Sequence, residues 1–109
     1  MKYCCTRNSS EHVSAAQAIA QGISADGGLF VPESLPKYTY EDLVRLSLCS
    51  YTERAAKIMA DFLPEFTEEE LLQCAQAAYA PEKFSGDSPA PLTLQQNGEL
   101  NICLLYTSP

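Results

Sequence analysis

The chain has 109 residues, of which 46% are hydrophobic, with 7 basic and 14 acidic side chains that give a formal charge of −7. This length suits one compact domain, because domains most often have about 100–150 residues. The negative charge repels phosphate backbones and anionic lipids, so it argues against nucleic-acid and membrane partners. No segment approaches the ~20 apolar residues that a membrane span needs.

The cysteines and the N-terminus predict a reduced, cytoplasmic protein. The first residues include no apolar core and no small-residue cleavage site of a secretory signal. Five cysteines are an odd number, none lies in a C-x-x-C pair, and His12 is the single histidine, so we expect no zinc site. The adjacent pair Cys4 and Cys5 is the one alternative, a redox or soft-metal site. Side chains of neighbouring strand residues point to opposite faces, however, so ordinary buried cysteines are the favoured interpretation.

The first elements along the chain are a short strand and a short helix. Lys2–Thr6 predicts a brief strand, followed by a polar loop that includes His12. Ser14 and Gln17 have the spacing of a capping box, which begins an alanine-rich helix. This helix is expected to end at Gln21, because the glycine after it suits a left-handed stop.

A turn and an edge strand come next. Asp26-Gly27-Gly28 predicts a turn, because two adjacent glycines tolerate positive φ. Leu29-Phe30-Val31 is a short apolar run closed by Pro32, which favours a strand at the edge of a sheet.

Three further helices are indicated by their N-terminal caps. Thr39 precedes the first, while Ser50 with Glu53 and Thr67 with Glu70 form capping boxes for the second and third. Prolines are expected to end the second and third of these helices, at Pro64 and Pro81. A polar loop is then predicted over residues 81–91.

A hairpin is predicted at the end of the chain. Leu92 and Leu94 on one side, and the alternating residues of Leu100–Leu104 on the other, flank Asn97-Gly98. Asn-Gly between alternating apolar runs is a strong hairpin signal. Together these elements predict an α+β fold: a small, mainly helical domain with about four helices and a few short strands.

The residues by themselves offer no active site. His12 is a lone histidine in a polar segment, and Gly27-Gly28 lacks the spacing of a phosphate-binding loop. The acidic residues stand at helix starts, where capping and the helix dipole explain them: Glu41, Asp42, Glu53, Glu68, Glu69 and Glu70. No lysine lies in a motif that would lower its pKa; the four are Lys2, Lys37, Lys57 and Lys83. We therefore predict no catalytic, cofactor-binding or metal-binding residue.

The order of the segments resembles the N-terminal domain of the threonine synthase family. Tyr3-Cys4-Cys5-Thr6-Arg7-Asn8 is similar to the aromatic-led Ser-Thr-Arg-Gly stretch that opens the family. The segment from Val13 to Ile23 is similar to the helix, with its closing Gly-Leu step, that follows this stretch in the family. The most specific element is the unbroken string Asp26-Gly27-Gly28-Leu29-Phe30-Val31-Pro32. The resemblance covers residues 1–103, which we expect to form the family's N-terminal domain.

The resemblance implies an enzyme that needs pyridoxal phosphate (PLP). Threonine synthases convert O-phospho-L-homoserine and water into L-threonine and phosphate, with PLP as the electron sink and a lysine as its Schiff-base partner. That lysine belongs to a motif beyond the segment present here, so the resemblance implies an inactive fragment that binds no PLP. Its implied partner is the PLP domain of the same chain. The resemblance leaves open whether Thr6 or Arg7 borders the active site.

Two interpretations remain at the sequence level. Residues 104–109 place Thr107 and Ser108 where the family has His-Gly, so we expect a truncated or non-native tail there. In an isolated fragment we also expect an exposed apolar surface, formed by Ala15, Ala16 and Ala18 or by the hairpin around Leu100–Leu104. The alternative function is an autonomous acidic helical module that binds a protein partner, because composition and charge suit it equally well.

Overall fold

The computed structural model describes residues 1–84 and 88–105. The chain divides into two compact units, unit 1 (Met1–Ala75) and unit 2 (Gln76–Pro109). All buried side chains among the described residues belong to unit 1. The expected boundary between residues 103 and 104 stays a prediction, and residues 106–109 lie outside the described part of the chain.

Unit 1 opens with a three-stranded antiparallel sheet of order β2-β1-β3. Its strands are β1 (Lys2–Cys5), β2 (His12–Ser14) and β3 (Phe30–Pro32). Tyr3 in the central strand pairs with Val13 on one side and with Pro32 on the other. The strand predicted before Pro32 is therefore present, shifted by one residue.

Strand β2 corrects the prediction of a polar loop around His12. The segment pairs with β1 because Val13, only 7% exposed, gives it one buried anchor. A strand of three residues with one apolar side chain has no readable alternation, so the pattern could not reveal it.

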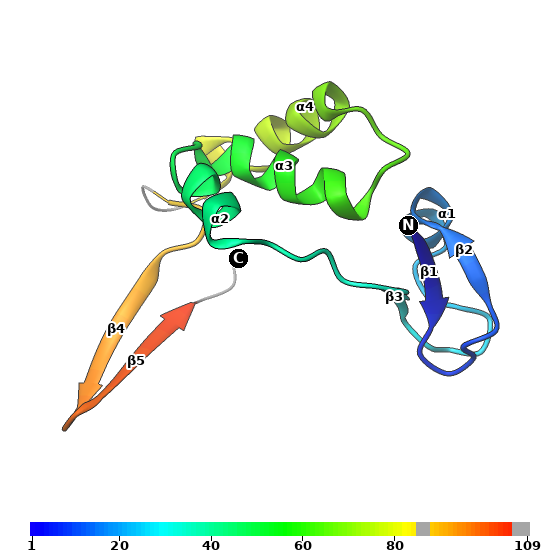
Figure 1. The fold of residues 1–109 in the computed structure, drawn as a ribbon, viewed down its shortest axis with the longest axis horizontal. Helices are drawn as coiled ribbons and strands as arrows, with labels where there is room; N and C mark the ends of the chain where they lie inside the picture. The colour runs from blue at the N-terminus through cyan, green and yellow to red at the C-terminus, as the bar shows by residue number, and fades with distance from the viewer. Residues whose placement is uncertain (85–87, 106–109) are drawn as a thin grey trace. The chain divides into compact units, whose positions relative to one another are not determined.

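Helix α1 (Ala15–Gln21) lies against β1 and β2 (Figure 1). The Ser14 hydroxyl accepts a hydrogen bond from the Gln17 amide at 3.2 Å, which is one half of the expected capping box. Ser14 is also the last residue of β2 and pairs with Lys2, so the same residue takes part in the sheet and in the helix cap. Gly22 has the expected positive φ of 77°, but its ψ of −78° and the bond from Ile23 N–H to Gln21 O make a γ-turn, not a left-handed cap.

The three capped helices form as predicted. They are α2 (Tyr40–Ser47), α3 (Tyr51–Phe62) and α4 (Glu68–Ala78). In each, a Ser or Thr side chain accepts from the third residue's amide, and that residue's carboxylate accepts from the cap's own amide. Arg54 of α3 then holds the end of α2, donating to Leu46 O at 2.8 Å and Cys49 O at 2.9 Å. These bonds add a side-chain donor to two backbone carbonyls at and just after the C-terminal end of α2.

Hydrogen bonds also join the sheet of unit 1 to its helical part. The Tyr3 hydroxyl donates to the Phe62 carbonyl at the end of α3, at 2.8 Å. The Ala16 amide at the start of α1 lies 3.4 Å from the Glu65 carboxylate, which accepts from it. Both bonds span long stretches of sequence.

The core of unit 1 is built from small side chains. It consists of Cys5, Val13, Ala15, Ala18, Ala56, Leu71 and Ala75. The expectation that Ala15 and Ala18 form an exposed face is therefore wrong: they are 1% and 8% exposed. Alanine lets α1 approach the sheet closely, so the small-residue face is used within unit 1.

Unit 2 contains the end of α4, a short 3-10 helix (Pro81–Lys83), and a hairpin of β4 (Leu92–Asn97) and β5 (Leu100–Leu105). The hairpin is confirmed, but its two loop residues are Gly98 and Glu99, because Asn97 pairs with Leu100. Gly98 has φ 63° and no non-glycine residue described has positive φ, as in a type II′ turn.

The register places the two apolar rows of the hairpin on opposite faces. Leu92 pairs with Leu105, and Leu94 with Cys103, whereas Ile102 pairs with Gln95. Directly paired residues share a face of the hairpin. With the two-residue loop, Leu92 and Leu94 therefore lie on the face opposite to Leu100, Ile102 and Leu104. Nearly all these side chains are exposed, as expected for this segment.

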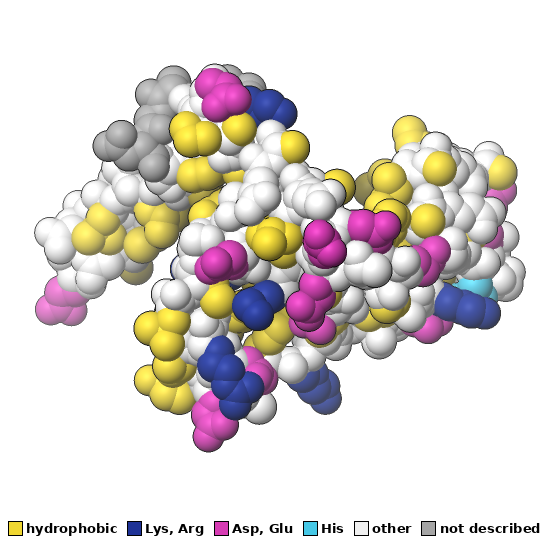
Figure 2. Space-filling model, turned by 90° about the horizontal axis from the view of Figure 1, so that it is seen from above, with side chains coloured by type: hydrophobic (Ala, Val, Ile, Leu, Met, Phe, Trp, Pro, Cys, Tyr) yellow, Lys and Arg dark blue, Asp and Glu magenta, His cyan; other side chains and the backbone are white. Residues whose placement is uncertain are grey.

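The α+β prediction, with four α-helices and a few short strands, is confirmed. In the described residues, no helix is both long enough and apolar enough to cross a membrane. Lysines and arginines are interspersed with acidic side chains over the helices (Figure 2).

Candidate functional site

Two loops of unit 1, residues 5–8 and 24–29, are hydrogen-bonded to each other. The Thr6 amide donates to Leu29 O at 2.9 Å, and the Thr6 hydroxyl accepts from the Leu29 amide at 3.0 Å. The Arg7 guanidinium donates to Asp26 O at 3.0 Å. Thr6 and Arg7, whose place the sequence left open, thus hold the second loop in position.

The glycines of the second loop fit this close approach. Gly27 has φ 77°, and its amide donates to Ser24 O at 2.9 Å to close a tight turn. A Cβ on Gly28 would lie 2.5 Å from Cys5 Sγ and 3.0 Å from Thr6 Oγ1. The two glycines therefore allow the tight turn that was predicted and the close packing of the two loops. Hydrogen bonds from other residues of the chain hold the second loop in place.

The Cys5 thiol lies beneath the two loops. It is 2% exposed, and its Sγ is 2.8 Å from the Ser24 hydroxyl, where either atom can donate. The Arg7 amide also donates to Cys5 Sγ at 3.3 Å, and the Gly28 amide donates to Ser24 Oγ at 3.1 Å. The Ser24 hydrogen bond lowers the pKa of the Cys5 thiol, against the opposing effect of burial. Burial keeps the group from substrates, so its role is to join the loops.

All five cysteines are free. Cys5 is buried as expected, but Cys74 and Cys103 are exposed, so the expectation of buried cysteines is wrong for them. In the described residues, no group of three or more His, Cys, Asp or Glu side chains is arranged to hold a metal ion.

His12 lies on β2 next to one carboxylate. Its Nδ1 is 3.8 Å from a Glu33 oxygen, and both side chains are 43% exposed. A solvated pair at this distance contributes little, and no serine or cysteine nucleophile is hydrogen-bonded to His12 in the described structure. This geometry supports no catalytic role for the histidine.

The carboxylates at the helix starts act as caps. Hydrogen bonds from Thr39 lower the pKa of Asp42, and hydrogen bonds from Ser50 lower the pKa of Glu53. Each carboxylate is thereby held in its charged form at a helix N-terminus. The structural interpretation made from the sequence is sufficient for both.

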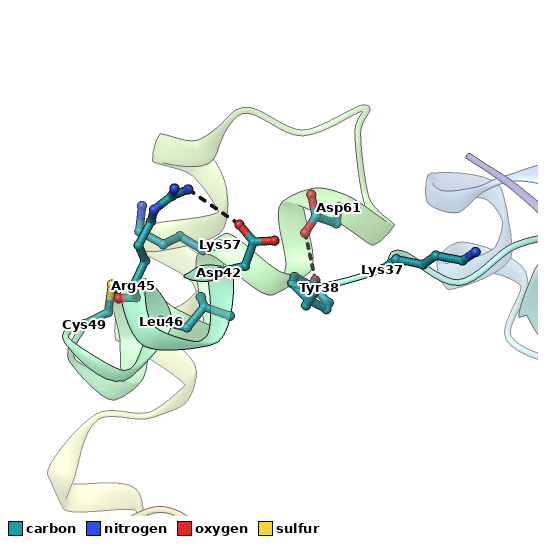
Figure 3. A pocket seen from close by; sticks show the side chains of 8 residues that line it. All are labelled: Lys37, Tyr38, Asp42, Arg45, Leu46, Cys49, Lys57 and Asp61. Carbon is teal, nitrogen blue, oxygen red and sulfur yellow. Dashed lines mark hydrogen bonds and ion pairs between the residues drawn. The ribbon is translucent and has the colours of Figure 1, made fainter. Parts of the chain in front are cut away.

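An open cavity of about 420 Å³ lies along α2 and α3. Its lining is mixed in charge, with three cationic and two acidic side chains: Lys37, Tyr38, Asp42, Arg45, Leu46, Cys49, Lys57 and Asp61. The Tyr38 hydroxyl donates a hydrogen bond to the Asp61 carboxylate at 2.7 Å, and Arg45 forms an ion pair with Asp42 at 3.5 Å; both are drawn as dashed lines in Figure 3. Lys37 points away from the other side chains (Figure 3).

The pair Tyr38–Asp61 was not predicted from the sequence. Burial, reinforced by the Asp61 carboxylate, raises the pKa of Tyr38 to about 12, so the phenol stays protonated as a donor. A separation of 23 residues between a loop and a helix gives no local signal that could have found it. Asp42 is paired with Arg45 and Asp61 accepts from Tyr38, so both carboxylates of the cavity are already engaged by neighbouring side chains.

The four lysines are all exposed: Lys2, Lys37, Lys57 and Lys83. A lysine that forms a Schiff base at neutral pH needs a desolvated pocket or a neighbouring cation that lowers its pKa. The exposed positions of these lysines do not supply the first condition.

Comparison with known proteins gives one consistent result. A family model described as "Threonine synthase N terminus" matches residues 2–79. The chain is similar to threonine synthase from Pseudomonas aeruginosa, with 29% identity over 110 residues that cover 100% of this chain and 23% of that protein.

Solved structures agree with this similarity. PLP-bound threonine synthase from Brucella melitensis matches with a TM-score of 0.77 and 28% identity, over 100% of this chain and 23% of that chain. Threonine synthase from Escherichia coli matches with a TM-score of 0.73 and 32% identity, over 85% of this chain and 20% of that chain. The chain therefore spans about a fifth of the length of the relatives it matches.

Proposed function

The chain belongs to the threonine synthase N-terminal family, and from this membership we propose that it acts as the N-terminal domain of a PLP-dependent threonine synthase. The family match over residues 2–79 is the observation that carries the proposal. The whole enzyme converts O-phospho-L-homoserine and water into L-threonine and phosphate. PLP, when bound, supplies the electron sink for that chemistry.

The residues of this chain do not fit a PLP site of their own. Every lysine is exposed, and the residues that resemble the family's motifs are occupied in packing residues 5–8 against residues 24–29. We assign the cofactor and its lysine to the larger part of the enzyme, which the relatives carry and this segment does not match. By itself the chain is expected to be inactive.

The partner in this proposal is the PLP domain of the same enzyme, and the ligand of that enzyme is O-phospho-L-homoserine. Two free, exposed cysteines, Cys74 and Cys103, suit a reducing compartment and support a cytoplasmic location. The alternative of an autonomous acidic interaction module gains no support from the geometry or the comparisons.

A chimera tests the proposal. Residues 1–103 replace the matching segment of the Pseudomonas aeruginosa threonine synthase, and phosphate release from O-phospho-L-homoserine is measured with PLP present. We expect a kcat/KM within about tenfold of the parent enzyme, equivalent to a small change in transition-state stabilisation. The parent enzyme without that segment, and the isolated 109-residue chain, are the controls and should release no phosphate.

The opposite result is equally clear. A chimera that folds and binds PLP, shown by its cofactor absorbance, but is no more active than the truncated parent enzyme would overturn the proposed function.

A further inference from the structure

Three large apolar side chains that are close in the sequence of unit 1 are exposed to solvent. Ile19, Ile23 and Leu29 are each 62% exposed. Ile23 and Leu29 face each other across an antiparallel bridge, and Ile19 precedes Ile23 by four residues, near the end of α1. We call these three residues the Ile19 patch. Figure 2 shows several hydrophobic side chains at the surface of the region of unit 1 that holds the sheet and α1.

The segment that carries the Ile19 patch is almost free of charge. Residues 13–32 contain one charged side chain, Asp26, although 19% of the whole chain is charged. Depletion of charge is the compositional mark of the buried centre of an interface. A solvated helix in so acidic a chain would be expected to carry charges on its outer face.

An apolar hollow adjoins the Ile19 patch. It has a volume of about 270 Å³, and Ile19 lines it together with Tyr3, Phe30 and Leu63. All the residues that line it are uncharged. The hollow is large enough to accept an apolar side chain of a partner beside the exposed Ile19.

The backbone beneath the Ile19 patch is held in place. A γ-turn at Gly22 joins α1 to Ile23, and the Ser24 amide donates to Gly28 O at 3.0 Å. Leu29 is fixed on both its amide and its carbonyl by Thr6. A preordered apolar surface loses little conformational entropy when it binds a partner.

We propose that the Ile19 patch and its hollow are the face on which unit 1 docks against the larger C-terminal part of the enzyme. This inference rests on the proposed function, and it goes further by naming the contact surface. The occupant follows from length: the relatives are more than four times as long as the part of them that this chain matches, and they carry that remainder in the same polypeptide. A covalently attached partner binds at high effective concentration, so a small apolar contact is sufficient.

The test compares the chimera described above with the isolated 109-residue chain. Ile23→Glu places a charge in the Ile19 patch. Leu48→Glu is the matched control, because Leu48 is also apolar and is 83% exposed at the end of α2. The readout is the rate at which a protease cleaves within residues 1–75, which follows the population of locally open states.

We expect residues 1–75 to be cleaved about tenfold more slowly in the chimera than in the isolated chain, because docking stabilises the folded unit. Ile23→Glu should abolish this protection, while Leu48→Glu retains it. In the isolated chain both variants should be cleaved at the parent rate, which shows that neither substitution unfolds unit 1.

Two results would overturn the docking proposal. One is that residues 1–75 of the chimera are cleaved equally slowly in the Ile23→Glu and the Leu48→Glu variants. The other is an isolated chain that sediments as a dimer and is dissociated by Ile23→Glu, because the occupant would then be a second copy. Phosphate release tests the proposed function separately. An active chimera without patch-dependent protection supports the proposed function and overturns the docking face. An inactive chimera with patch-dependent protection supports the docking face and contradicts the proposed function.

Discussion

Position 28 shows how a single missing side chain sets the geometry of the paired loops. Gly28 lies directly against Cys5 and Thr6, and its φ is not among the positive values. Its requirement for glycine is therefore one of space. Gly22 is the opposite case, because a Cβ there meets nothing within 4 Å but φ is 77°.

We predict that Gly28→Ala destabilises the protein by about 1–3 kcal/mol, the usual cost of forcing extra volume into a packed site. The reason is the 2.5 Å approach of the new methyl group to Cys5 Sγ. Urea unfolding of the 109-residue chain measures the effect. Cys5→Ala removes the opposing sulfur, so the double variant should be more stable than the sum of the two single changes predicts. Strict additivity would contradict the contact.

The second residue-scale prediction concerns Tyr38. Its phenol is expected to ionise at a pKa of about 12, from an ordinary value of 10.0. Because the folded state holds this proton more tightly, the resulting stability is present below pH 10 and is lost as the pH rises through the folded pKa. A spectrophotometric phenolate titration should show a late component that Tyr38→Phe removes and Asp61→Asn shifts to lower pH. A late component that survives in Tyr38→Phe would assign it to another tyrosine.

At the scale of elements, the three capped helices share one device. Each uses a hydroxyl and a carboxylate three residues apart to satisfy amides at the helix start. The signal is local in sequence and the bonds are local in space. This is why the starts of α2, α3 and α4 could be predicted accurately from the chain alone.

The caps also predict how stability depends on pH. The pKa of Glu53 lies below its ordinary value of 4.5 in the folded protein, chiefly because the Ser50 amide donates to it. The unfolded chain therefore binds more protons as the pH falls below 4.5, and the stabilisation is lost through the folded pKa. Glu53→Gln should lower the free energy of unfolding at pH 7 and make no difference near pH 2.

The control for this prediction is Glu41→Gln, which removes a carboxylate from a first helical turn where it makes an exposed pair with Arg45. Exposed pairs of this kind contribute little. Unfolding free energies measured from pH 2 to pH 7 decide the matter, and a deficit of Glu53→Gln that stays constant over this range would contradict the charged cap.

Features that depend on non-local contacts leave no local signal in the sequence. β2 is too short to show a period, and the γ-turn at Gly22 depends on ψ, which a glycine does not reveal. The candidate site was the harder part, because the Thr6–Leu29 and Tyr38–Asp61 contacts join residues 23 positions apart. The Ala15 and Ala18 face was predicted exposed because small side chains indicate close packing without indicating the partner.

At the scale of the whole molecule, the small core and the large exposed apolar surface belong together. Four of the seven buried hydrophobic residues are alanines, and all seven lie in unit 1. Short side chains bring helices and sheet close together, but each buries little apolar area. In unit 2 the described hairpin strands expose their leucines on both faces, and an isolated two-stranded hairpin is marginal in water.

Leu71 is accordingly the most vulnerable position of the isolated chain. It is 4% exposed and is the one leucine in the buried core described. Leu71→Ala removes its methyl groups and leaves a cavity, at a cost of about 2–5 kcal/mol, which approaches the whole stability of a marginal domain. We expect the variant to lose cooperative urea unfolding by circular dichroism at 25 °C, whereas Leu48→Ala, at an 83% exposed position, changes stability little. In the chimera, docking should restore part of the lost cooperativity; a Leu71→Ala chain that unfolds cooperatively at the parent's urea midpoint would show that the core lies elsewhere.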